Sequence, residues 1–175
     1  VKYLSEKGEY EYCWQTCYGP AISRIYAAVI STHGDDNGLV LPYHLAPLQA
    51  IVVPIMKKGS EEAVAKKTKE VVAALVKAGI RSEADFSEST PGFKYNQWEM
   101  KGVPFRIEIG AREAESGKLT VARRDNKSKH TVPEAELSSW LAAQADAMFS
   151  DMKNKARAEL ESRLSRAETL DALSK

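Results

Sequence analysis

From residue 48 onwards, the hydrophobic residues alternate between the period of strands and the period of helices. Four segments have the apolar or alternating pattern of strands: 48–55, 80–86, 103–110 and 118–124. Three segments have helical spacing or helix end signals: 60–78, 92–100 and a long stretch that starts at Pro133. The order β-α-β-α-β-β-α predicts a mixed sheet with helices packed against it.

The first part of the chain has a different pattern. A polar stretch with many aromatic residues, 1–19, precedes apolar residues at helical spacing over 21–31, which predict a buried helix. Turn-forming residues at 33–38 end this helix, and the extended, proline-containing connector 39–47 comes next. We therefore expect a domain boundary within this connector.

The composition is that of an ordinary globular protein. The chain has 175 residues, 25 Lys and Arg against 24 Asp and Glu, and 43% hydrophobic residues. It has no apolar run of about 18 residues and no signal-peptide pattern, so we expect neither a membrane span nor secretion. Its two cysteines, Cys13 and Cys17, lack zinc-site spacing, so we expect a cytoplasmic protein with no metal site in this chain. Because the chain begins at Val1 within polar sequence, we interpret it as a piece of a longer protein.

Four strings of residues say more than a generic α/β pattern. At 15–24 (QTCYGPAISR) a glycine-containing turn runs into a helix with an arginine in its first turn, and this resembles motif 3 of the class II aminoacyl-tRNA synthetases. The strings 33–42 (HGDDNGLVLP), 46–55 (APLQAIVVPI) and, most specifically, 91–110 (PGFKYNQWEMKGVPFRIEIG) resemble the prolyl-tRNA synthetases in their archaeal and eukaryote-like form. The resemblance covers nearly the whole chain, from about residue 12 to the middle of the final helix.

The resemblance implies an α/β fold and a C-terminal fragment of such an enzyme. Residues 1–45 would be the end of the catalytic domain, with its last helix and motif 3. Residues 46–149 would be an anticodon-binding domain, a five-stranded mixed sheet flanked by helices. Residues 150–175 would be a helix that leads toward a further C-terminal domain. The implied sheet agrees with the element order read from the hydrophobic pattern.

The implied activity is that of a proline–tRNA ligase, which attaches proline to its tRNA through prolyl-adenylate and uses ATP with magnesium. The implied partners are the proline tRNA, ATP, proline and a second copy of the parent enzyme. Motifs 1 and 2, which supply the dimer interface and most substrate contacts in the family, are absent here. We therefore expect this chain alone to be inactive and able to remain monomeric. The alternative hypothesis is a non-catalytic, synthetase-like protein that binds tRNA in an accessory role.

Three residues match positions at the catalytic centre of the family. The motif 3 arginine contacts ATP in class II synthetases, and Arg24 occupies its position. A permanently charged planar group can stack on adenine and also bond phosphate, which lysine cannot do. Tyr18 and Gly19 match positions beside the proline pocket. The residues alone leave open a core aromatic side chain, a turn glycine and a solvated arginine at a helix start.

Residues 94–129 carry nine basic side chains against five acidic ones, which predicts a surface that holds RNA phosphates. Proline anticodons share two guanines, whose N1–H and N2–H₂ donors suit a carboxylate and whose O6 and N7 acceptors suit arginine. The resemblance implies these anticodon contacts: Glu99 on a guanine edge, Arg106 as its guanidinium counterpart, Tyr95 as a stacking platform, Pro91 as an apolar wall, and Arg112 and Lys129 on phosphates or bases.

Other interpretations of these residues stay open at this point. Glu99 and Arg106 could form a surface ion pair worth under about 1 kcal/mol. Tyr95 could belong to a helix face packed on the sheet. The segment 123–125 could equally be a strand end with a local ion pair, and His33 is best explained as a histidine at a helix C-terminus.

Overall fold

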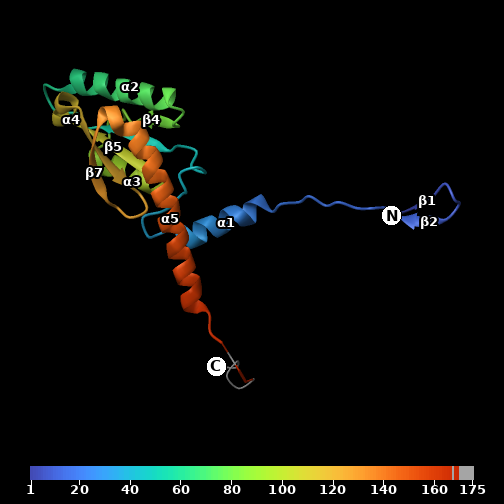
Figure 1. The fold of residues 1–175 in the computed structure, drawn as a ribbon. Helices are drawn as coiled ribbons and strands as arrows, with labels where there is room; N and C mark the ends of the chain where they lie inside the picture. Colours follow the sequence, from blue (N-terminus) through green and yellow to red (C-terminus); the bar gives the residue numbers. More distant parts are fainter. Residues whose placement is uncertain (167, 170–175) are drawn as a thin grey trace.

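The computed structural model describes residues 1–166, 168 and 169, and its centre is a five-stranded sheet (Figure 1). The strand order is β4-β3-β5-β6-β7: Ser82–Ala84, Ala50–Pro54, Phe105–Ile109, Lys118–Arg123 and Lys129–Pro133. β3 pairs in parallel with β4 and β5, whereas β5, β6 and β7 pair antiparallel. The predicted mixed sheet of five strands is confirmed.

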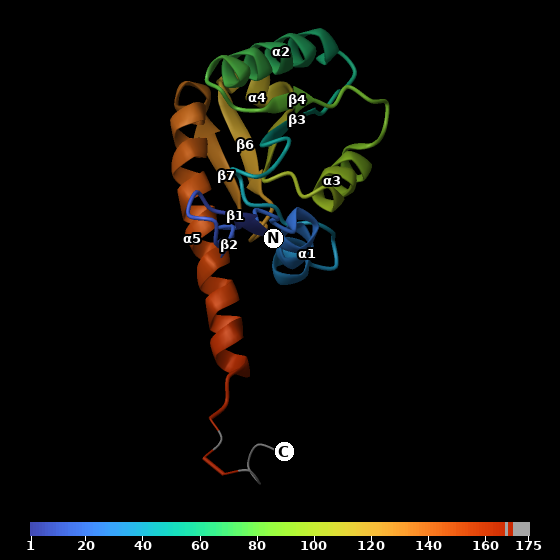
Figure 2. The ribbon, with the colours of Figure 1, turned by 90° about the vertical axis from the view of Figure 1, so that its right-hand side faces the viewer.

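Helices cover the two faces of the sheet unequally. On one face, α2 (Glu61–Lys77) and α5 (Leu137–Arg163) bury the main apolar core against the strands (Figure 2). On the other face, α3 (Pro91–Met100) packs on Ile51 and Val53 of β3 in a smaller core. The remaining polar face of β5, β6 and β7 is open next to α3, and the short helix α4 (Ala111–Ser116) links β5 to β6.

Side chains along β5 point alternately to the two faces of the sheet, so this strand contributes to the main core and to the polar face. Phe105, Ile107 and Ile109 point into the main core, so the residues between them, Arg106 and Glu108, point to the side of α3. All five residues are buried. A buried arginine and glutamate on a strand need partners, and these partners form the site described below.

Several elements differ in extent from those that the sequence predicts. α4 occupies the loop expected between the two strands of the hairpin. The long helix begins at Leu137, after the 3₁₀ turn Glu134–Glu136, and ends at Arg163. Of the expected C-terminal segment 150–175, residues 167 and 170–175 lie outside the described part.

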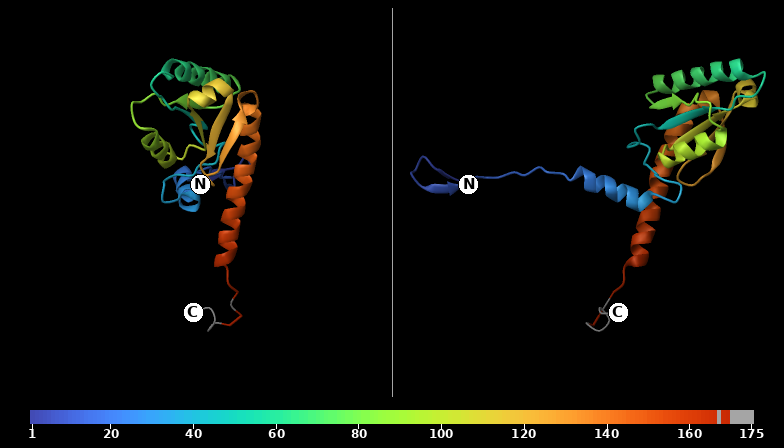
Figure 3. Two further views of the ribbon diagram at one scale, coloured as in Figure 1. Left: turned by 90° about the vertical axis from the view of Figure 1, so that its left-hand side faces the viewer. Right: turned by 180° about the vertical axis from the view of Figure 1, so that it is seen from behind.

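Three strands that the hydrophobic pattern did not predict are present. β7 is mostly polar and exposed, because it forms the edge of the sheet. β1 (Lys2–Leu4) and β2 (Tyr10–Tyr12) form an exposed antiparallel hairpin at the tip of the N-terminal arm. Seen from behind in Figure 3, this arm projects away from the sheet.

The helix predicted at 21–31 is present as α1 (Ile22–His33), but the expectation that it is buried was wrong. Ile22 is 73% exposed and Ile25 61% exposed. The helical spacing was interpreted correctly, but in the described chain only the C-terminal end of the helix is partly covered: Val29 and Ile30 are half-buried, whereas the apolar residues of the first two turns are exposed.

Candidate nucleic-acid interface

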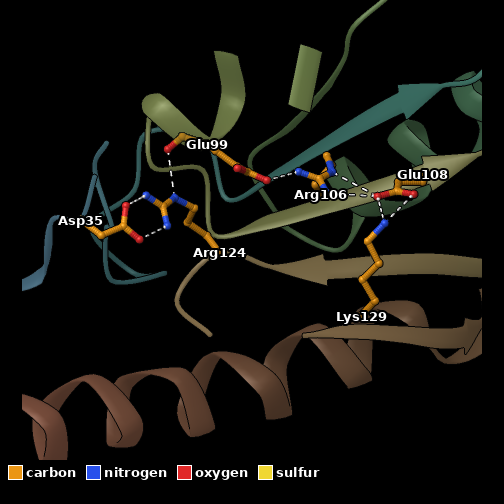
Figure 4. A network of polar contacts seen from close by, with 6 residues as sticks. All are labelled: Asp35, Glu99, Arg106, Glu108, Arg124 and Lys129. Atoms are coloured by element: carbon orange, nitrogen blue, oxygen red, sulfur yellow. Dashed lines mark hydrogen bonds and ion pairs between the residues drawn. The ribbon is translucent and has the colours of Figure 1, made fainter. Parts of the chain in front are cut away.

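Arg106 lies at the centre of a polar cluster on the open side of the sheet (Figure 4). Its Nη1 donates to Glu99 Oε1 at 2.6 Å, and its Nε and Nη2 both donate to Glu108 Oε1 at 3.2 Å. The guanidinium also stacks on the ring of Tyr95, 3.9 Å from its centroid. We call these four residues the Arg106 clamp. Because the Arg106 side chain is only 11% exposed, the pair is not the surface ion pair that the sequence left open.

Lys129 on β7 adds a positive charge at the rim of the clamp. Its Nζ lies 3.1 Å from Glu108 Oε1 and 5.9 Å from the Tyr95 ring centroid, while more than half of its side chain is exposed. Burial and the neighbouring Glu108 carboxylate raise the pKa of Tyr95 to about 12. The tyrosine is therefore neutral throughout the physiological range. Its ring also packs against the smaller core of Ile51, Val53 and Val103, so the helix-face packing that the sequence left open for it is present.

Helix α3 carries Tyr95 and Glu99, and a buried charge fixes it on the sheet. Lys94 Nζ donates to the carbonyl of Asp85 at 2.8 Å and lies 3.9 Å from its Oδ1, with both side chains almost fully buried. Trp98 Nε1 donates to Asp85 Oδ2 at 2.7 Å. Burial raises the pKa of Asp85, but hydrogen bonds from Ser87 and Trp98 outweigh it, so the net pKa is lowered and the residue remains a carboxylate.

The start of α3 is set by local sequence. Thr90 caps the helix by accepting from the Phe93 amide, and Pro91 occupies the first helical turn, where its missing N–H costs nothing. Pro91 is exposed at this end of the helix, one helix length away from Glu99.

Of the predicted anticodon residues, the structure brings Tyr95, Glu99, Arg106 and Lys129 together. Arg112 lies apart on α4, exposed, at an open hollow that Lys118, Thr120 and Thr131 also line. The sheet thus presents one polar face that runs from α3 across β5, β6 and β7 to α4.

The residues predicted for the catalytic centre lie elsewhere. Tyr18 is 95% exposed and Gly19 exposed on the N-terminal arm. Arg24 is exposed in the first turn of α1, and within the described part of the chain its side chain makes no hydrogen bond or ion pair. The structure does not bring these three residues to the Arg106 clamp.

Sequence reasoning missed Glu108 and Arg124 as partners of this site. Glu108 could have been found, because it lies two residues from Arg106 on a predicted strand and so shares its face. Arg124 had no such signal, since its carboxylate partner Asp35 lies 89 residues away. The neighbouring Arg123 pairs with Asp125 at 2.7 Å, so the local ion pair considered for this segment is present.

Neither a metal site nor a membrane span is evident in the described residues. Among residues 1–166, 168 and 169, no group of three or more His, Cys, Asp or Glu side chains could hold a metal ion. None of the helices in that part of the chain is long and apolar enough to cross a membrane. Cys13 and Cys17 are both free.

Comparison with known proteins connects this fold to the recognition of tRNA. The family described as "Anticodon binding domain" matches residues 49–144. Among curated proteins, the proline–tRNA ligases of Thermofilum pendens and Methanosarcina mazei are each 46% identical over 94% of this chain. Among solved structures, the prolyl-tRNA synthetase of Cryptosporidium parvum complexed with L-proline and AMP covers 98% of the chain at 36% identity, with a TM-score of 0.84.

The chain corresponds to only part of each of these proteins. It spans about a third of the curated relatives, 34% of each of the two named above, and 37% of the solved structure. The matched part is the C-terminal part of these proteins. The chain therefore belongs to the anticodon binding domain family, in the form found in the C-terminal part of prolyl-tRNA synthetases.

Proposed function

We propose that this chain is the anticodon-reading part of a proline–tRNA ligase and that the Arg106 clamp recognises a guanine of the proline anticodon. The proposal rests on one observation: the Glu99 carboxylate is held in place by a hydrogen bond and is still accessible from outside. One of its carboxylate oxygens is held by Arg106, and the side chain is still about a third exposed at the edge of the open sheet face. A fixed and accessible carboxylate is what the N1–H and N2–H₂ donors of guanine require.

The surroundings of Glu99 suit a single-stranded RNA loop. In this proposal Tyr95 offers a ring on which a splayed base stacks, and Arg106 holds the carboxylate in its reading position. Lys129 and, across the sheet face, Arg112 neutralise phosphates, while Pro91 forms an apolar wall at the far end of α3. The exposure of Lys129 and Arg112 supports this role, because a phosphate can reach both side chains.

The other parts of the proposal concern the parent enzyme. Residues 1–45 would belong to its catalytic domain, 46–149 to the anticodon-binding domain and 150–175 to a C-terminal extension. Arg24 would contact ATP, and Tyr18 and Gly19 would border the proline pocket. The parent enzyme would use magnesium with ATP, act as a homodimer and work in the cytoplasm. The exposure of Arg24 supports its availability to a nucleotide, whereas no residue of this chain is assigned to the magnesium ion.

The test compares Glu99→Gln with the unaltered chain in binding to an RNA hairpin that carries the proline anticodon loop. Glutamine keeps an oxygen that accepts from Arg106, but it replaces the second acceptor by an NH₂ group that cannot bond the guanine donors. We expect binding to fall about 5- to 150-fold, the worth of one bidentate base contact of about 1–3 kcal/mol. Binding to the same hairpin with both guanines replaced should be equally weak for the two chains.

Glu115→Gln is the matched control, because Glu115 is exposed on α4 and makes no side-chain ion pair among the described residues. It removes the same charge from the same domain without altering the clamp. Equal losses in the two variants would mean that charge alone governs binding, and the proposed reading of guanine would then be wrong. The unaltered chain should also show no proline-dependent exchange of pyrophosphate into ATP.

A further inference from the structure

The turn after α1 is joined to the end of α3 through one buried arginine. Arg124 donates from Nη1 and Nη2 to the two carboxylate oxygens of Asp35, at 2.8 and 2.5 Å. From Nε it donates to the carbonyl of Glu99 at 3.0 Å. Its side chain is only 3% exposed, so this guanidinium cannot serve RNA or solvent. Figure 4 shows it between Asp35 on one side and the last turn of α3 on the other.

The turn after α1 and the end of α3, which Arg124 joins, also lie in direct contact. Asp35 and Gly38 exchange two backbone hydrogen bonds, of 3.0 and 2.9 Å, and Asp35 Oδ1 accepts from the Asn37 amide. The Leu39 amide donates to the carbonyl of Met100 at 3.1 Å. A side chain at Gly38 would come within 2.5 Å of the Met100 Cα, so the turn lies directly against the end of α3.

The guanidinium is also well placed for the helix itself. A cation at the last carbonyls of a helix is favoured by the helix dipole. Here it adds a second donor to the Glu99 carbonyl, which also accepts from the Gly102 amide at 3.0 Å. The residue whose carbonyl it binds is Glu99, whose side chain belongs to the Arg106 clamp. We call Asp35, Arg124 and the Glu99 carbonyl the α1–α3 latch.

We propose that Arg124 is a positioning residue whose latch couples the placement of α1, which carries Arg24, to the occupancy of the guanine-reading carboxylate of Glu99. The inference rests on the proposed function and extends it. Coupling of this kind is reciprocal: a base that fixes Glu99 steadies the end of α1, and loss of the latch loosens Glu99. The physical connection is continuous, from Asp35 through Arg124 and the Glu99 backbone to Arg106.

The first experiment needs no RNA and measures amide hydrogen exchange in the whole chain. Asp35→Asn removes the charge that faces Arg124, and its control Asp36→Asn removes the adjacent exposed charge, which has no ion pair among the described residues. We expect Asp35→Asn to exchange about tenfold faster in the last turn of α1 and also at Lys101 and Gly102, as for a lost charge-assisted hydrogen bond. Faster exchange at the α1 end alone would overturn the latch.

The second experiment adds the RNA hairpin with the proline anticodon loop. In the unaltered chain and in Asp36→Asn, the hairpin should slow exchange in the last turn of α1, far from the bound guanine. In Asp35→Asn this slowing should be lost, and the preference for guanine over replaced bases should fall about fivefold, within the usual range of coupling between sites. Asp35→Glu, which keeps a carboxylate, should restore part of both effects.

The outcomes separate this inference from the proposed function. If the unaltered chain prefers the guanine hairpin but α1 exchanges at the same rate with and without it, the coupling is refuted and the proposed function stands. If the unaltered chain shows no preference for guanine, both are refuted. A merely structural role for Arg124 would change global stability in Asp35→Asn while leaving the preference for guanine unchanged.

Discussion

Replacing Arg106 by lysine tests whether the contacts of the Arg106 clamp contribute to stability as a buried cluster or only as much as a surface ion pair. Lysine keeps the charge but cannot donate to Glu99 and Glu108 together, nor stack as a plane on Tyr95. Complete loss of one partner from a buried ion pair costs about 3–5 kcal/mol. Because the ammonium remakes one contact and Glu108 retains Lys129 at 3.1 Å, we expect Arg106→Lys to lower the free energy of unfolding by about 2–3 kcal/mol.

The measurement is urea unfolding followed by far-ultraviolet circular dichroism, with Arg112→Lys as control. Arg112 is exposed and makes no side-chain ion pair in the described part of the chain, so its replacement should change stability by less than about 0.5 kcal/mol. If the two variants were equally stable, the Arg106 contacts would contribute no more than a surface ion pair, and the reasoning from burial would be refuted.

This prediction also decides how RNA-binding experiments on the clamp are interpreted. A variant that truncates Arg106 leaves Glu108 short of a partner and frees Tyr95, so weaker binding would not prove a lost contact with a base. Glu99→Gln preserves the acceptor for Arg106 and changes only the accessible oxygen. It is therefore the cleaner probe of guanine recognition.

Three further changes test the contacts around the site. A hydrogen bond from its arginine partner holds the pKa of Asp35 at about 2, so its stabilisation is complete above pH 4 and is lost as the pH falls toward 2. Because this side chain is a third exposed, the difference in unfolding free energy from Asp35→Asn should be about 1 kcal/mol at pH 7 and should close near pH 2; a constant difference would contradict the assignment. Lys94→Met should cost about 2–4 kcal/mol in thermal unfolding, because it leaves the buried Asp85 carboxylate without its cation; a neutral result would show that Ser and Trp donors suffice. Gly38→Ala should destabilise by at least about 2 kcal/mol, more than Gly59→Ala, which also has a positive φ but meets no atom within 4 Å; equal effects would mean that the turn moves freely off α3.

The hydrophobic pattern of the sequence predicted those strands and helices that bury many of their own side chains. The run 48–55 predicted β3 because a strand covered on both faces must be apolar throughout. β7 was missed for the opposite reason: as an edge strand it keeps only Val132 fully buried. His130 on the same strand lies 5.2 Å from the ring of Trp140, a contact that exists only once α5 has packed on the sheet.

In the candidate site too, the sequence indicates some residues, whereas contacts that depend on tertiary packing could not be predicted from it. Glu99 and Arg106 could be proposed from the sequence because they lie on one helix and the strand that comes after it, seven residues apart. Their burial could not be predicted, because it depends on how α3 lies across β3. The pairing of Arg124 with Asp35 depends on the path of the whole intervening chain, and neither residue carries a local mark of its partner.

The proposed function assigns selectivity for guanine to the polar face of the sheet, in a chain of near-neutral net charge. Phosphate contacts supply affinity without sequence information, and here the exposed cations that suit them, which include Lys129, Arg112 and Lys118, lie at the margins of the face. The centre of the face is occupied by carboxylates that Arg106 fixes in place, and an isolated carboxylate would repel RNA. In the proposed function, the buried guanidinium of Arg106 neutralises Glu99, so that the carboxylate approaches a nucleic acid at a small electrostatic cost. It then accepts from guanine, the base that offers two donors on its pairing edge. Under the proposed function, selectivity therefore depends on keeping Arg106 buried, and the residues that hold α3 against the sheet contribute to recognition together with the groups that touch the base.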